Sequence, residues 1–330
     1  MNLRQLMISA VAIMSLGATS AIAEPAIIYD LGGKFDKSFN EMAFTGAERW
    51  KTETGGTYRE IELSSEAQRE QALRRFAEAG NNPIVMAGFA FSTVLGEVAK
   101  DYPNTRFAVI DGYVPDVSNV LNIGFTEHTG SYLVGMMAAM KSKSGVVGFI
   151  GGMDIPIIGR FGCGYVQGVK AANPDATIIY NMTGTTPSAW NDPVKGGELV
   201  KAQVSQGADV VYHAAGGTGV GVLQAAADAG ILGIGVDANQ NYMQSGHVLT
   251  SMVKRVDTGV YDSFKAGADL AGGFATLSLG NGGISYAMDE HNASLVTSEM
   301  VSAVESAKAK IISGELMVHD YMSDGSCPVK

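Results

Sequence analysis

Polar and aromatic side chains recur at the carboxyl ends of short apolar segments that we predict to be strands. They are Asp36, Phe39, Asp111, Trp190 and Asp237. A single aspartate after a strand is usually a turn or N-cap residue, but three of them on loops predicted to line one cleft indicate a binding site. Carboxylates accept hydrogen bonds from N–H and O–H groups, and aromatic rings stack on a flat ligand. The pattern predicts a site that holds a small, flat, polyhydroxylated molecule without changing it.

The stretch over residues 31–50 contains the densest group of such side chains. Before it, residues 26–30 (AIIYD) form a short apolar run that predicts a buried parallel strand. Gly32-Gly33 allows a sharp turn, and the S-x-x-E pattern at 38–41 is a capping box that predicts a helix beginning after Ser38. The connecting loop lies at the sheet edge where open α/β folds bind ligands. A solvated loop without a binding role is the alternative interpretation.

The mature sequence lacks the signatures of common catalytic sites. It has no P-loop, no H-E-x-x-H and no G-x-S-x-G motif. The run at 216–221 (GGTGVG) does not fit G-x-G-x-x-G, but it can present backbone N–H groups at a helix start or allow close packing. The histidines are scattered singly, without metal-ligand spacing, and we interpret each as a surface or hinge residue: His128, His213, His247, His291 and His319. We expect no cofactor, no metal and no enzymatic activity.

The first 23 residues have the features of a cleaved signal peptide. Arg4 gives a positive amino-terminal region, residues 6–16 are apolar, and residues 21–23 (AIA) form a cleavage site before Glu24. The apolar run is shorter than the roughly 20 residues that span a bilayer, and no cysteine follows it that could carry a lipid. We predict export to the periplasm without a stable membrane anchor.

The two cysteines, Cys163 and Cys327, allow two interpretations. In an oxidising compartment such a pair is often a disulfide, and a bridge would attach the carboxyl-terminal tail to the helix predicted around Cys163. The alternative is two buried free thiols.

Length and pattern indicate an α/β fold with two lobes. The 330-residue chain is long enough for two domains, and strands alternate with helices in two successive runs, as in βαβ units around a parallel sheet. We predict two doubly wound lobes joined by two or three crossing hinge strands. Residues 24–127 with about 257–282 would form the amino-terminal lobe, and residues 128–256 with about 283–330 the carboxyl-terminal lobe.

The carboxyl-terminal part carries three further predicted elements. They are a helix over residues 259–274, a glycine-broken hairpin over 275–287 and a last helix over 297–313. The net charge of −10 argues against nucleic acid as a partner, because that binding depends on neutralising phosphates with Lys and Arg. We expect a monomer.

Five sequence stretches resemble one known family. GGKFDKSFNEMAFTGA, VIDGY, VGFIGGMDIPII, GVDANQ and TSMVKRVD, in this order behind a signal peptide, are similar to the basic membrane protein (BMP) family. Its members are substrate-binding components of ABC transporters with a type I periplasmic-binding-protein fold, and many take purine nucleosides. The resemblance covers essentially the whole mature chain and implies an ABC transporter permease as partner.

The resemblance also implies roles for individual residues. The purine would lie between Phe39 and Trp190, and its edges would meet Asp36, Asn40 and Asp111. Ribose hydroxyls would meet Asp237 with Lys254 beside it, and the backbone of Gly216 and Gly217. Trp190 and Asn239 depart from the family, whose members often carry Phe and Asp there, so a free base such as adenine and a nucleoside such as adenosine both remain open.

Other function classes remain as alternatives. A pentose or hexose receptor would have the same architecture. A hydrolase acting on nucleosides would need a metal or a tuned acid–base pair, whereas the aspartates here sit on different loops. An effector domain of a transcription regulator is opposed by the signal peptide and by the absence of a DNA-binding segment.

Overall fold

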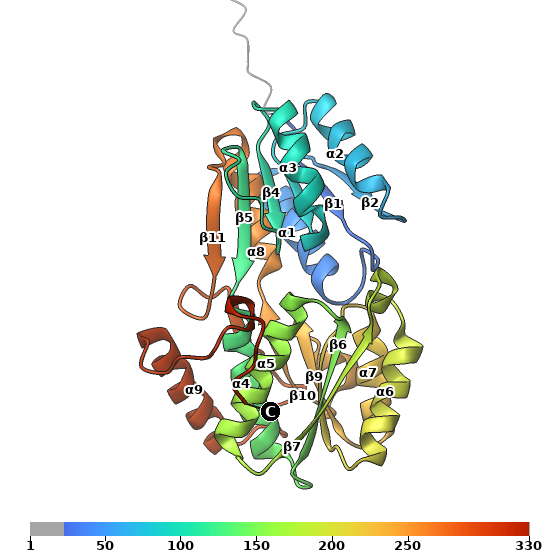
Figure 1. The fold of residues 1–330 in the computed structure, drawn as a ribbon, viewed down its shortest axis with the longest axis vertical. Coiled ribbons are helices and arrows are strands. Elements are labelled where there is room, and N and C mark those ends of the chain that lie inside the picture. The colour runs from blue at the N-terminus through green and yellow to red at the C-terminus, as the bar shows by residue number, and fades with distance from the viewer. Residues whose placement is uncertain (1–22, 330) are drawn as a thin grey trace, which may run out of the picture.

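Two six-stranded sheets form the framework of the protein, one above the other along its long axis (Figure 1). The computed structural model describes residues 23–329, so the predicted signal peptide lies outside the described residues except for Ala23. The upper sheet, in the order β11-β5-β4-β3-β1-β2, contains β1 (Ala26–Tyr29), β2 (Arg59–Glu62), β3 (Ile84–Ala87), β4 (Phe107–Ile110), β5 (Val120–Phe125) and β11 (Gly273–Leu277). The lower sheet, in the order β12-β10-β9-β8-β6-β7, contains β6 (Val146–Met153), β7 (Thr177–Gly184), β8 (Val210–Ala214), β9 (Leu232–Asp237), β10 (Val248–Lys254) and β12 (Ile284–Tyr286). The predicted α/β class is confirmed.

Helices cover both faces of the upper sheet, which makes it doubly wound. On one face lie α1 (Phe39–Thr54) and α8 (Val256–Ala266), and on the other α2 (Gln68–Glu78) and α3 (Ser92–Asp101). Positions 27 and 29 of β1 belong to the first core and positions 26 and 28 to the second. Successive side chains of a strand point to opposite faces, so a strand covered on both sides must be apolar throughout. Strand β1 (AIIY) is fully buried for this reason.

The lower sheet is covered in the same way. Helices α4 (Glu127–Lys141) and α5 (Pro156–Ala172) lie on one face, α6 (Pro193–Ser205) and α7 (Thr218–Asp228) on the other, and α9 (Ser298–Ser313) packs against α4. Helices α4 and α5 can approach closely because Gly164 has no side chain. A Cβ atom at this position would lie only 2.3 Å from the carbonyl oxygen of His128. Among residues 23–329, no helix combines the length and apolarity needed to cross a membrane. We call each sheet with its helices a lobe.

Within the described residues the chain passes between the lobes three times. The crossings lie between β5 and α4, between β10 and α8, and between β11 and β12. The three crossings agree with the two or three crossing segments that the sequence predicts. The cleft between the lobes lies beside these segments.

The predicted helix over 259–274 is present but ends eight residues early, and the predicted hairpin over 275–287 is wrong. Helix α8 ends at Ala266, because Gly267 follows with a φ of 57°, a conformation that favours glycine and interrupts the helix. Strand β11 then pairs in parallel with β5 of the upper sheet, whereas β12 pairs antiparallel with β10 of the lower sheet. The two strands therefore belong to different lobes. Periodicity alone does not reveal which sheet a short strand joins.

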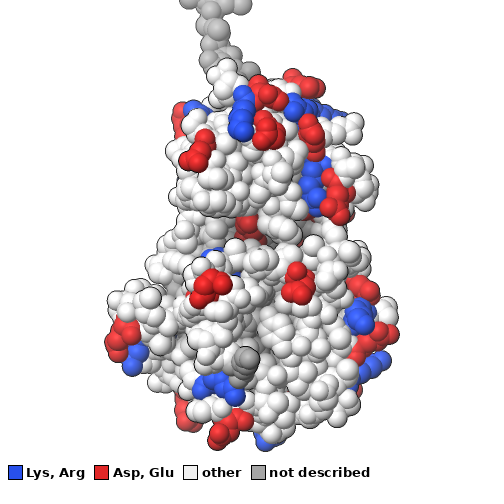
Figure 2. Space-filling model, viewed as in Figure 1, with Lys and Arg blue, Asp and Glu red and all other residues white. Residues whose placement is uncertain are grey.

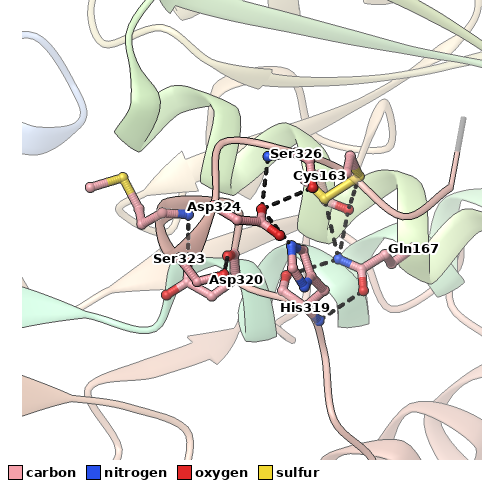
Figure 3. The surroundings of a disulfide bond; sticks show 9 residues. Cys163, Gln167, His319, Asp320, Ser323, Asp324 and Ser326 are labelled. Carbon is pink, nitrogen blue, oxygen red and sulfur yellow. Dashed lines mark hydrogen bonds and ion pairs between the residues drawn. A yellow bond between two sulfur atoms is a disulfide. The ribbon is translucent and has the colours of Figure 1, made fainter.

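The carboxyl-terminal tail is fixed to helix α5. The structure joins Cys163 of α5 to Cys327 by a disulfide, with their Cα atoms 5.6 Å apart (Figure 3). One turn further along α5, the Gln167 side chain donates to the His319 carbonyl at 3.0 Å and accepts from the His319 N–H at 2.8 Å. The disulfide closes a loop with a sequence separation of 164 residues. The tail therefore lies along α5 in the lower lobe.

The disulfide gives the first testable prediction. Protein that is unfolded without reductant should give no product with a thiol-specific label, and two labelled cysteines after reduction. Mass spectrometry reads both results directly. The variant Cys327→Ser is the control, since it should expose one thiol under non-reducing conditions. Two labelled thiols in the unreduced wild-type protein would show that the pair is unbridged.

Candidate ligand-binding site

A pocket lies between the two lobes where the carboxyl ends of their strands meet. It contains about 680 Å³ of empty space, part of which is open to solvent. Figure 2 shows a waist between the lobes in which acidic atoms are visible. The lining residues come from both lobes: Asp30, Leu31, Gly32, Asp36, Phe39, Asn40, Ala87, Gly88, Phe89, Asp111, Ile157, Ile158, Phe161, Trp190, Ala214, Gly216, Val236, Asp237 and Lys254.

The structure brings together eight of the nine residues that the sequence singles out for ligand binding. They are Asp36, Phe39, Asn40, Asp111, Trp190, Gly216, Asp237 and Lys254. Gly217 is not in the pocket lining, although a Cβ atom built on it would lie 3.6 Å from the Cβ of Asp36. Asn239, which departs from the family pattern, lies outside the lining and donates to Asp289 at 2.6 Å. Its identity therefore has no direct effect on the pocket.

Asp111 and Asp237 occupy equivalent places in the two lobes. Each lies at the carboxyl end of the third strand of its sheet, Asp111 directly after β4 and Asp237 as the last residue of β9. Their φ values are 62° and 64°, a left-handed conformation that is uncommon for residues other than glycine. Such backbone persists when the surroundings fix it, and it is frequent at binding sites. Both lobes thus turn an aspartate sharply toward the cleft.

Asp36 caps the helix that follows it. Its carboxylate accepts from the backbone N–H groups of Ser38, Asn40 and Glu41 at 2.8, 3.0 and 3.1 Å. Only one of these bonds, from Asn40, ends on Oδ2, so this oxygen keeps a lone pair for a ligand. Burial raises the pKa of Asp36 to about 7, although the three N–H donors favour its ionised form.

The predicted capping box at Ser38 and Glu41 is wrong. Ser38 precedes α1, but its side chain makes no capping hydrogen bond. The carboxylate of Asp36 accepts from the free N–H groups at the start of the helix in its place. The Ser38 hydroxyl instead donates to the carboxylate of Asp237 at 2.5 Å, across the cleft.

Two buried acceptors in the pocket have no hydrogen-bond partner among the described residues. They are Oδ1 of Asn40 and Oδ1 of Asp111. The amide nitrogen of Asn40 is already committed, because it donates to the carbonyl oxygens of Asp30 and Gly33 at 3.3 and 3.2 Å. Leaving a buried acceptor unpaired costs free energy. A ligand that brings N–H or O–H donors would satisfy both atoms.

Lys254, the last residue of β10, is buried among acidic and aromatic side chains. Its Nζ lies 2.6 Å from Asp111 Oδ2 and 2.9 Å from Glu127 Oε1. Three rings surround the ammonium with centroids at 4.8 to 5.3 Å: Phe125, Phe39 and Phe161. Burial lowers the pKa of Lys254, but the negative charges around it outweigh this and raise the pKa above its ordinary value. Lys254 is therefore a permanent cation.

Lys254 lies near Asp237, whose pKa its positive charge lowers against the effect of burial, but among the described residues it forms no ion pair with that carboxylate. Lys254 forms its ion pairs with Asp111 and Glu127, whereas Asp237 accepts from Ser38. The reason is geometric, since closing the lobes brings the end of β10 against the end of β4. Burial raises the pKa of both aspartates, to about 6 for Asp111.

Direct hydrogen bonds hold the lobes together over the pocket. Besides the bond from Ser38 to Asp237, the Gln240 side chain donates to the carbonyl oxygen of Lys37 at 2.9 Å. Gln240 Oε1 also accepts from the Val236 N–H at 2.9 Å and lies 2.9 Å from Nε2 of the buried His213. The structure is therefore that of a closed cleft.

The aromatic side chains of the pocket come from separate elements. Trp190 ends a short 3₁₀ segment (Pro187–Trp190). Its ring fits against the backbone because Gly152 has no side chain, whose Cβ atom would lie 2.2 Å from the ring. Phe39 begins α1, and the lining also includes Phe89 and Phe161. Several ring pairs are thus available to contact a flat ligand.

Some residues of the site escape sequence reasoning. Glu127 and Phe161 touch Lys254, but neither directly follows a strand, and Phe161 lies inside the helix α5. His213 is fully buried, so its interpretation as a surface or hinge residue is wrong. Gln240 lies in GVDANQ, one of the stretches that carry the family resemblance, and that stretch was the available signal.

Comparison with known proteins identifies relatives over most of the chain. A model of the Bmp family, described as ABC transporter substrate-binding protein PnrA-like, matches residues 25–321. The ABC transporter nucleoside-binding protein BmpA of Lactococcus lactis subsp. cremoris is 32% identical, over 92% of this chain and 90% of its own length. Basic membrane protein A of Borreliella afzelii is 31% identical, over 92% and 93%.

The fold has a solved counterpart. An ABC transporter solute-binding protein from Aeropyrum pernix K1 superposes with a TM-score of 0.82 and 28% identity, covering 89% of this chain and 92% of that one. The predicted type I periplasmic-binding-protein fold is thereby confirmed. The chain belongs to the Bmp family of ABC transporter substrate-binding proteins, as the sequence resemblance predicts.

Proposed function

We propose that this protein is the periplasmic receptor of an ABC importer for a purine nucleoside or purine base, and that it releases its ligand unchanged. The observation that carries the proposal is the chemistry of the pocket. Unpaired acceptors and aromatic rings meet there in a buried space between two lobes. The similarity to the ABC transporter nucleoside-binding protein BmpA of Lactococcus lactis supports the same ligand class.

The hydrogen-bonding groups of the pocket favour a ligand rich in donors. Asn40 Oδ1, Asp111 Oδ1 and Asp36 Oδ2 each have capacity to accept. Amino and N–H groups of a purine, and hydroxyl groups of a ribose, are donors of this kind. A flat purine would also contact the rings of Phe39 and Trp190. Gly216 and Gly217 would bring backbone groups close to the ligand.

The charges of the pocket oppose a phosphorylated ligand. Lys254 is the one cation among the described residues that line it, and both Asp111 and Glu127 already neutralise that ammonium. The remaining lining carboxylates, such as Asp36 and Asp237, would repel a phosphate at short range. The receptor should therefore take nucleosides and exclude nucleotides.

Opening of the lobes would release the ligand. We propose lobes of residues 24–127 with about 257–282, and 128–256 with about 283–330, which is supported by the membership of β11 in the upper sheet and β12 in the lower. Opening would break the contacts Ser38–Asp237 and Lys37–Gln240. The proposed receptor acts as a monomer free in the periplasm, without a lipid anchor, and delivers its ligand to a permease.

Calorimetric titration of the wild-type protein tests the proposed function. The ligands are adenosine, guanosine, inosine, their bases, adenosine 5′-phosphate, ribose and arabinose. We expect tight binding of at least one nucleoside or base, and weak or absent binding of the phosphate and the sugars. Preferential binding of ribose or arabinose would support a sugar receptor. Release of free base and ribose from a bound nucleoside would support a hydrolase.

Removing the Trp190 ring should weaken ligand binding. Base–aromatic stacking contributes roughly 1–3 kcal/mol, so Trp190→Ala should raise the Kd for a purine ligand by about 5- to 150-fold. Trp190 fluorescence in the wild-type protein should also change on titration. The control is Tyr242→Ala, an exposed aromatic residue outside the pocket, which should leave Kd unchanged. Equal affinities in all three proteins would contradict the stacking role.

Replacing Asp237 should separate nucleoside from base recognition. Hydrogen bonds to charged groups contribute roughly 1.5–3 kcal/mol, so Asp237→Asn should weaken nucleoside binding about tenfold or more if the carboxylate accepts from ribose hydroxyls. Binding of the free base should change little. Ser38→Ala is the control, because it removes only the contact across the cleft and should affect both ligands alike. Equal losses for nucleoside and base in Asp237→Asn would assign Asp237 to closure instead.

Ligand affinity should fall as the solution becomes acidic. In the closed cleft burial raises the pKa of Asp36 to about 7 and that of Asp111 to about 6. Ligand N–H and O–H donors favour the ionised carboxylates, so binding at low pH must first remove a proton. Kd should be lowest above about pH 8 and rise as the pH falls through 7 and 6, with proton release detectable by calorimetry in different buffers. A Kd that stays constant to about pH 5 would show that neither carboxylate contacts the ligand as an anion.

A further inference from the structure

A line of charged side chains runs from the carboxyl-terminal tail into the ligand pocket. Its members, in order, are Asp320, Arg160, Glu127, Lys254 and Asp111, which we call the tail-to-pocket network. The side chain of Asp320 is 30% exposed, whereas those of Glu127 and Lys254 are 0% and 1% exposed. The network therefore connects the protein surface with the buried site.

The outer end of the network is the fork between Asp320 and Arg160. Arg160 Nε donates to Asp320 Oδ1 at 2.7 Å, and Nη2 donates to Oδ2, so the pair is bidentate. The tail segment that carries Asp320 is held on α5 by the disulfide Cys163–Cys327 and by the hydrogen bonds between Gln167 and His319 (Figure 3). Nothing in the pocket lining belongs to this tail.

Arg160 also binds the chain at the first crossing between the lobes, and so connects the tail with that crossing. Its Nη1 donates to the carbonyl oxygen of Phe125 at 2.8 Å and to Glu127 Oε2 at 3.0 Å. Phe125 ends β5 and Glu127 begins α4, so the guanidinium holds the chain where it leaves the upper lobe. The ring of Phe125 also lies 4.8 Å from the ammonium of Lys254.

Glu127 connects the guanidinium with the pocket lysine. Its Oε2 accepts from Arg160, and its Oε1 lies 2.9 Å from Lys254 Nζ. A fully buried carboxylate needs charged or hydrogen-bonding partners to stay ionised. Without the fork to Asp320, Arg160 would lose the partner that fixes its guanidinium, and Glu127 would be free to turn away from Lys254. Asp111 would then be the remaining ion-pair partner of the ammonium, and its ligand-facing oxygen would shift.

We propose that Asp320 and Arg160 are positioning residues of the ligand pocket, which orient Glu127 and thereby hold Lys254 and Asp111 in their binding geometry. The inference rests on the proposed function in so far as the pocket takes a ligand. It extends that function to a tail that contributes no lining residue. The tail thus tunes ligand affinity without touching the ligand.

The chain supplies a matched control for the substitution Asp320→Asn. Asp320 Oδ1 accepts from the Met322 N–H at 2.9 Å, and Asp324 Oδ1 accepts from the Ser326 N–H at 2.9 Å. Asparagine can keep both of these turn-stabilising bonds. Asp320 also binds Arg160, whereas Asp324 lies 3.1 Å from Nε2 of His319 (Figure 3). The two variants disturb the same tail, but only one breaks the network.

A spectroscopic experiment tests the network in the ligand-free protein. Lysines are labelled with ¹³C at Cε, and the Lys254 resonance is assigned by its loss in Lys254→Met. We expect Asp320→Asn and Arg160→Gln to shift this resonance, and Asp324→Asn to leave it in place. An unmoved resonance in Asp320→Asn, or an equal shift in Asp324→Asn, would overturn the proposal. This result does not depend on which ligand the protein binds.

The second experiment measures affinity for adenosine, guanosine and inosine by calorimetry. Substitutions along coupled networks change affinity by roughly 2- to 30-fold, and we expect a loss of this size in Asp320→Asn but not in Asp324→Asn. The double variant Asp320→Asn/Arg160→Gln should bind no more weakly than Arg160→Gln alone, because Asp320 acts through Arg160. Additive losses, or equal losses in the two tail variants, would show a general packing effect and refute the network. A wild-type protein that binds no purine compound would refute the proposed function, and the spectroscopic result would still decide the network.

Discussion

Burying the ammonium of Lys254 is the constraint on which the site depends. A buried charge without partners costs several kcal/mol, so acidic groups must surround this one. They come from different parts of the fold, Asp111 from the upper lobe and Glu127 from the first crossing segment. The charge is therefore fully compensated only when the lobes are closed. Because its charge is neutralised by these ion pairs, Lys254 is not available to bind an anion. Carboxylate and amide oxygens without partners then remain in the pocket.

The two lobes build the site with the same backbone device. Equivalent strands β4 and β9 each deliver an aspartate in a left-handed conformation, Asp111 and Asp237. The surroundings then give the two carboxylates different roles, because one meets Lys254 and the other meets the hydroxyl of Ser38. Both contacts join the lobes, but Asp111 compensates a buried charge whereas Asp237 accepts from a neutral hydroxyl. A repeated fold has in this way produced an asymmetric pocket.

The sequence predicted the architecture and the residues that line the site better than it predicted their hydrogen-bond and ion-pair partners. Apolar runs such as AIIY specify buried parallel strands, and an aspartate after a strand reaches the cleft whatever its partner. Hydrogen-bond partners depend on how distant segments meet, so Asp36 displaced Ser38 as the cap and Lys254 paired with Asp111 instead of Asp237. Glu127 and its link to the tail arise from the crossing of helices, which no local pattern records.

The closed pocket is proposed to select a purine nucleoside or base over sugars and phosphorylated compounds. Native mass spectrometry tests this selectivity most directly, with ligand-free refolded protein mixed with equal concentrations of purine nucleosides, purine bases, nucleotides, pentoses and hexoses. The account predicts one dominant complex, whose added mass is that of a nucleoside or a base. A complex with a sugar or a nucleotide, or no complex at all, would contradict it.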